Sequence, residues 1–60
     1  MIEFLQRAVD CAGFVRDDLR EAMRAADPVA GIVLIGLIRD AAVLQTKISN
    51  LLGAVNERGA

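Results

Sequence analysis

Apolar residues recur along residues 28–56 at spacings that alternate between four and three positions. This heptad pattern is typical of a helix that packs one stripe against another helix. It predicts a long helix over about residues 28–56. The stripe consists of Ala30, Leu34, Leu37, Ala41, Leu44, Ile48, Leu51 and Val55.

A second stripe with the same spacing predicts a helix over about residues 2–26, where good helix formers dominate. Gly13 is its weak point, and we expect it to permit the close approach of another backbone. The stripe consists of Met1, Leu5, Ala8, Ala12, Val15, Leu19, Ala22 and Ala26.

Asp27-Pro28 separates the two predicted helices. Proline disfavours helix at the preceding residue and suits the first position of a new helix, so Asp27 is the expected N-cap. A very short connection favours antiparallel neighbours. We therefore expect an all-α antiparallel hairpin, with Gly59 ending the second helix. The alternative is one long helix kinked at Pro28.

Folding the chain about Asp27-Pro28 places Leu19 opposite Leu37 and Ala8 opposite Ile48, so that every stripe residue meets another. Small and large residues alternate across the layers, which allows close helix packing. The expected hairpin core is Leu5, Ala8, Ala12, Val15, Leu19, Ala22, Leu34, Leu37, Ala41, Leu44, Ile48 and Leu51.

The chain carries more apolar residues than one hairpin can bury, and leaving them all in water is unfavourable. We expect two hairpins to pack antiparallel as a homodimeric four-helix bundle, or as a higher oligomer. The expected interface with the second copy or another partner is Phe4, Val9, Cys11, Phe14, Ile32, Val33, Ile35 and Ile38.

In this layout the chain resembles the plasmid copy-number regulator Rop, a small helical hairpin that dimerises with alternating small and large core layers. The resemblance concerns layout alone and implies a dimeric bundle. No functional residue carries over from it.

Composition limits the chemistry. The 60 residues make a single helical-hairpin domain, 1–60, and a core this small needs reinforcement. Cys11 is the one cysteine and there is no histidine, so we expect no internal disulfide, no metal site and no cofactor. The expectation for Cys11 is a buried, structural thiol. A lone cysteine and no recognisable export signal favour a cytoplasmic protein.

Arg16, Arg20 and Arg24 recur every four residues. A regulator that binds nucleic acid in the manner of Rop, or binds an acidic partner, would use such a stripe. The interleaved Asp17, Asp18 and Glu21 and the net charge of −1 favour a solvated face instead.

The uncharged run from Val29 to Ile38 is half the length of a membrane span, which needs about 20 residues. Arg39 and Asp40 end it, which favours a buried interface over the alternative of a small membrane-active protein. No nucleophile stands beside a base in the pattern, so we expect no catalysis. The sequence predicts a bacterial or phage adaptor, inhibitor or regulator that acts through protein–protein interaction.

Overall fold

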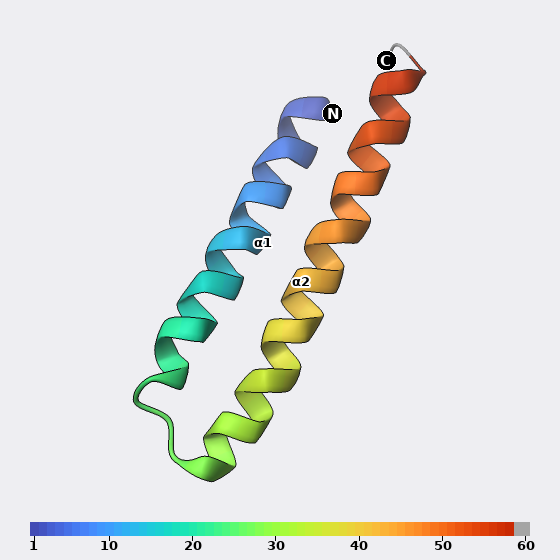
Figure 1. Ribbon diagram of the computed structural model, residues 1–60. Helices are drawn as coiled ribbons and strands as arrows, with labels where there is room; N and C mark the ends of the chain where they lie inside the picture. The colour runs from blue at the N-terminus through green and yellow to red at the C-terminus, as the bar shows by residue number, and fades with distance from the viewer. Residues whose placement is uncertain (59–60) are drawn as a thin grey trace.

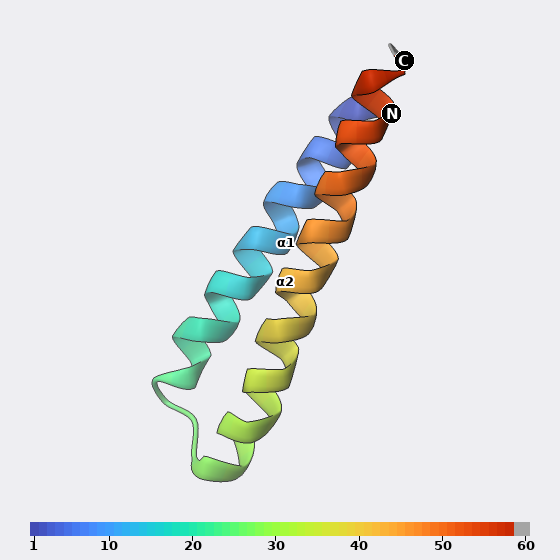
Figure 2. The same cartoon turned by 45° about the vertical axis from the view of Figure 1, so that its right-hand side comes forward.

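The structure, a computed structural model, describes residues 1–58, and those residues form two helices and no strand (Figure 1). Helix α1 spans Ile2–Met23 and helix α2 spans Pro28–Glu57. They run antiparallel, so both termini lie at one end of a rod measuring 47 × 14 × 10 Å (Figure 2). The predicted all-α hairpin is confirmed, and the single kinked helix is wrong. Gly59 lies outside the described residues.

Helix α1 ends three residues earlier than the predicted boundary at residue 26. The last amides make tighter bonds to carbonyls three residues back, from Arg24 N–H to Glu21 O at 3.2 Å and from Ala25 N–H to Ala22 O at 3.1 Å. Such bonds satisfy carbonyls at a helix end while the chain leaves the helical path. The connection is therefore the four residues 24–27, longer than the sequence indicates.

Helix α2 begins as Asp27 and Pro28 predict. Asp27 is extended, with φ −73° and ψ 171°, and its carboxylate accepts a hydrogen bond from the Ala30 amide at 2.8 Å. Its carbonyl accepts the first helical bond, from Gly31 N–H at 2.8 Å. In both views the first turn of α2 projects beyond the end of α1 (Figures 1 and 2).

The core between the helices follows a heptad stripe that is rotated from the expected one. Half of the expected stripe lies in it, but Leu37, Leu44 and Leu51 are 44%, 53% and 48% exposed. The positions beside them in sequence, Ile38, Gln45 and Leu52, are half-buried instead. The buried and half-buried stripe is Ile2, Leu5, Val9, Ala12, Arg16, Leu19 and Met23 on α1, Ala26 in the connection, and Gly31, Leu34, Ile38, Ala41, Gln45, Ile48, Leu52 and Val55 on α2.

We call residues seven apart on one helix a heptad column. Relative to the orientation that the sequence predicts, both helices are rotated about their own axes by one such column, about 50° at 3.5 residues per turn. Val15 and Ala22 of the expected core are exposed, whereas Val9 and Ile38 of the expected interface are half-buried between the helices. The physical reason is that Gln45 and Arg16 bond to each other across the hairpin, so their stripe can pack despite its two polar members.

Candidate interaction surface

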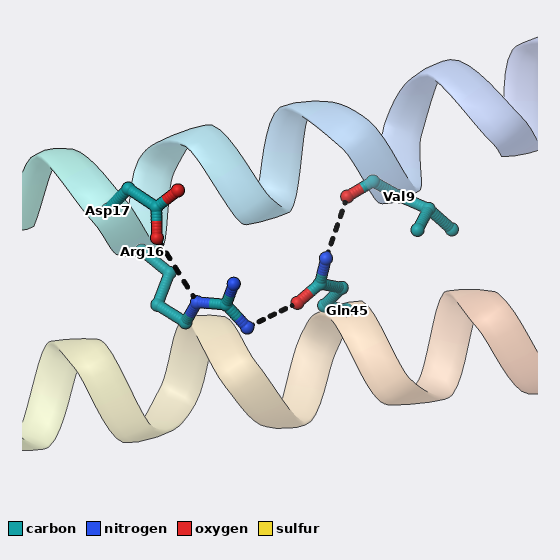
Figure 3. Close-up of polar contacts among 4 residues, drawn as sticks. All are labelled: Val9, Arg16, Asp17 and Gln45. Carbon is teal, nitrogen blue, oxygen red and sulfur yellow. Dashed lines mark hydrogen bonds and ion pairs between the residues drawn. The ribbon is translucent and has the colours of Figure 1, made fainter.

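Two polar side chains meet in the middle of the hairpin (Figure 3). Arg16 Nη1 of α1 donates to Gln45 Oε1 of α2 at 2.8 Å, and Gln45 Nε2 donates to the backbone carbonyl of Val9 at 3.3 Å. We call this set of contacts among Arg16, Gln45 and Val9 the polar clasp. Because Gln45 bonds to α1 residues on both sides of its own level, it fixes how far the helices slide past each other.

Gly13 makes room for the clasp. A Cβ placed on Gly13 would lie 2.9 Å from Gln45 Nε2, closer than such atoms approach in proteins. The sequence predicts a close approach at Gly13, and the structure shows that the approaching group is the Gln45 side-chain amide and not another backbone.

The three arginines of the predicted stripe differ in their surroundings. Arg16 is half-buried in the clasp and lies 3.6 Å from an Asp17 carboxylate oxygen. Arg24 pairs with Glu21 at 3.3 Å, and Arg20 is exposed. The guanidinium groups therefore do not form a continuous, free cationic surface.

The rotation of the helices leaves one side of the hairpin apolar. An antiparallel helix pair has a pseudo-two-fold axis perpendicular to the plane of the two helices. This axis relates the two helices, so the rows of residues that flank the core stripe at the same heptad position in α1 and α2 lie on the same face of the hairpin. This leucine face consists of Met1 at the N-cap of α1, Ala8, Val15 and Ala22 of α1, and Ala30, Leu37, Leu44 and Leu51 of α2.

The leucine face contains no charged side chain, and charged side chains lie at its α2 edge. Asp40 and Lys47 are exposed there, seven residues apart and hence in one heptad column. With Arg39, Val43 and Leu44 they line a shallow hollow on α2. Within residues 1–58, neither Asp40 nor Lys47 forms an ion pair.

A second apolar region lies at the projecting end of α2. Val29 and Ile32 are 77% and 73% exposed, and Val33 is exposed beside them. We call these three residues the apolar tip. Of the remaining expected interface residues, Ile35, Phe14 and Phe4 are also exposed, with the Arg7 guanidinium 5.6 Å from the centre of the Phe4 ring.

Chemically reactive groups are sparse. The sequence predicts a buried Cys11, but its side chain is exposed on α1 because the helix is turned. Among residues 1–58, no three acidic, histidine or cysteine side chains gather in a group that could hold a metal ion.

Helix α2 is long and apolar enough to cross a membrane, with a mean hydropathy of 1.7 over its most apolar window. This is weak evidence for a span, because core helices of soluble proteins and signal sequences have the same length and composition. No protein-family model matches the chain, and neither a curated protein nor a solved structure is detectably similar to it.

Proposed function

We propose that this protein is a non-catalytic interaction module of the cytoplasm, an adaptor, inhibitor or regulator that works as a homodimeric four-helix bundle and binds another protein. The observation that supports this proposal is the uncharged leucine face along the hairpin. Contiguous apolar surface with charges at its edge is characteristic of protein interaction sites.

The energetics favour a second copy on this face. Among residues 1–58 of the isolated hairpin, only Ala12 and Val55 are buried, and they remain 8% and 4% exposed. A core below about 70–80 residues rarely contributes more than about 3–5 kcal/mol. Burying a leucine side chain fully contributes about 1.5–3 kcal/mol. Leu37, Leu44 and Leu51 are about half exposed, so covering them would add about 2–4 kcal/mol per copy, comparable with the stability of the hairpin itself.

The surface left over after dimerisation is where the other protein would bind. Val29, Ile32 and Phe14 lie on the outer sides of the two helices, away from the hairpin core and the leucine face, and Val33 lies in the column of Asp40 and Lys47 at the edge of that face. A group of exposed apolar side chains of this kind is characteristic of a protein interaction site.

The test has two parts. Sedimentation without detergent should give a soluble dimer. In a pull-down from the native host, Ile32→Asp should lose a specifically retained protein while remaining dimeric. Ser49→Asp, at an exposed position on the polar side of α2, is the matched control and should retain that protein.

A soluble monomer at every concentration would contradict the dimer. Retention of the same protein by wild type and Ile32→Asp would contradict the role of the tip.

The length and hydropathy of α2 make a membrane-active protein the second candidate. Arg39 and Asp40 would then enter the lipid, which costs about 2.5–3.5 kcal/mol each on insertion scales. Flotation of the protein with phospholipid vesicles, and insolubility without detergent, would favour this candidate over the bundle.

A further inference from the structure

We infer that the second copy packs antiparallel on the leucine face, with the turn of each hairpin beside the termini of the other, an arrangement we call head to tail. Leu44 then lies at the two-fold axis, and Asp40 of each copy pairs with Lys47 of the other. This inference rests on the proposed dimer and specifies its orientation. It follows from the positions of the leucines and of two charges that have no ion-pair partner within residues 1–58.

The leucine column sets the axis. When a helix packs against a second copy of itself in the opposite direction, positions equally far before and after the axis meet. With the axis at Leu44, the Leu37 side chain meets Leu51 of the other copy, and Leu44 meets its own equivalent. The three leucines that each α2 contributes to the leucine face are then covered by leucines.

The same axis places the charges. Asp40 lies four residues before Leu44 and Lys47 three residues after it, so the two charges oppose each other across the axis within one residue, about 1.5 Å along the helix. Both lie in the heptad column at the outer edge of the leucine face. The dimer therefore gains two symmetry-related ion pairs at its rim, which contribute to orientation and specificity.

The opposite orientation, with both tips at one end, sets like charges together. In that arrangement α2 lies against α1 of the other copy. The clasp holds Gln45 at the level between Val9 and Arg16, so Asp40 lies near the level of Asp18. Asp18 occupies the matching edge column of α1, and two carboxylates would face each other twice.

Charge exchange between two variants tests this orientation. Asp40→Lys alone places lysine against lysine, and Lys47→Asp alone places aspartate against aspartate, so each should dimerise at least tenfold more weakly than wild type. Mixed together they should form a heterodimer, because both rim pairs are then complementary. Glu57→Lys changes an exposed charge far from the axis and is the matched control, which should dimerise like wild type.

The outcomes separate this inference from the proposed function. A wild-type dimer in which Asp40→Lys dimerises more tightly and Lys47→Asp is unchanged would overturn the head-to-tail orientation and leave the dimer standing. Failure of the mixture to associate would also overturn it. A monomeric wild type would overturn both.

Cys11 provides an independent readout. In the head-to-tail dimer the two α1 helices are neighbours, and their exposed Cys11 thiols line one groove on the order of 10 Å apart along the bundle. With both tips at one end they would lie at opposite corners. A short bis-maleimide should cross-link the two Cys11 thiols of a head-to-tail wild-type dimer and should fail to cross-link a dimer with both tips at one end. Cys11→Ser is the negative control.

Discussion

Gln45 joins the two helices in the middle of the hairpin. Its side chain bonds to α1 at two points, and its amide occupies the space above Gly13. A polar residue at one core position of a helix pair commonly fixes alignment at some cost in stability. Here it aligns the hairpin and turns both helices, which brings the three leucines to the surface.

The tie between Gly13 and Gln45 predicts non-additive stabilities. Gln45→Ala should cost about 1–2 kcal/mol, because two hydrogen bonds are lost. Gly13→Ala should stabilise that variant by up to about 1 kcal/mol, the usual difference in helix propensity. In the wild-type background Gly13→Ala should stabilise the protein by much less, because the new methyl group displaces the Gln45 amide. Urea unfolding of the four proteins measures the coupling.

Gly36 is the matched control for this cycle, because a Cβ added there meets nothing within 4 Å. Gly36→Ala should stabilise the protein equally with and without Gln45. Equal gains from Gly13→Ala in both backgrounds would show that the clasp does not depend on the glycine.

At the scale of the elements, the Asp27 cap determines where α2 starts. Asp27→Ala should destabilise the protein by about 1 kcal/mol, because the Ala30 amide loses its acceptor. Asp27→Asn and Asp27→Ser, which keep a side-chain acceptor, should retain most of the stability. Thermal unfolding at one fixed concentration provides the comparison. A loss in Asp27→Asn as large as that in Asp27→Ala would point to the charge and not the cap.

Much of the fold could be predicted from the sequence, because Asp27, Pro28 and two heptad repeats carry strong local signals. The choice of stripe could not. On α2 the columns of Leu37 and of Ile38 are both largely apolar, and counting apolar residues favours the one without Gln45. Only the three-dimensional pairing of Gln45 with Arg16 shows that the polar column can be packed.

At the scale of the whole molecule, one hairpin has too little core, so assembly and folding should be linked. The midpoint of thermal unfolding should therefore rise with protein concentration. Leu44→Asp should yield a monomer of lower stability whose midpoint no longer changes with concentration, because a charge then lies at the two-fold axis. Differential scanning calorimetry over a hundredfold range of protein concentration measures the midpoint of each protein.

Val43→Asp is the matched control for Leu44→Asp. Val43 is the neighbouring exposed residue, but it lies on the outer side of α2, so its variant should keep the concentration dependence. Leu44→Ser serves if the aspartate variant does not fold. A midpoint independent of concentration in wild type would contradict the linkage.

The candidate interaction surface was only partly predictable from the sequence. The surplus of apolar residues indicates self-association, and the sequence places Phe14 and Ile32, both exposed in the structure, in the expected interface. It does not indicate the leucine face, because the heptad pattern places Leu37 and Leu44 in the hairpin core. A signal was present in the charges: Asp40 and Lys47 flank Leu44 at distances that a two-fold axis would match.

The projecting first turn of α2 has a further consequence. In a head-to-tail pair the two apolar tips point away from each other, at opposite ends of a bundle built from 47 Å rods. The dimer would then be bivalent. It would bind one copy of its target at each end, with the two copies too far apart to contact each other. A dimeric or arrayed target would gain avidity from such a spacer, whereas a monomeric target would bind each end independently.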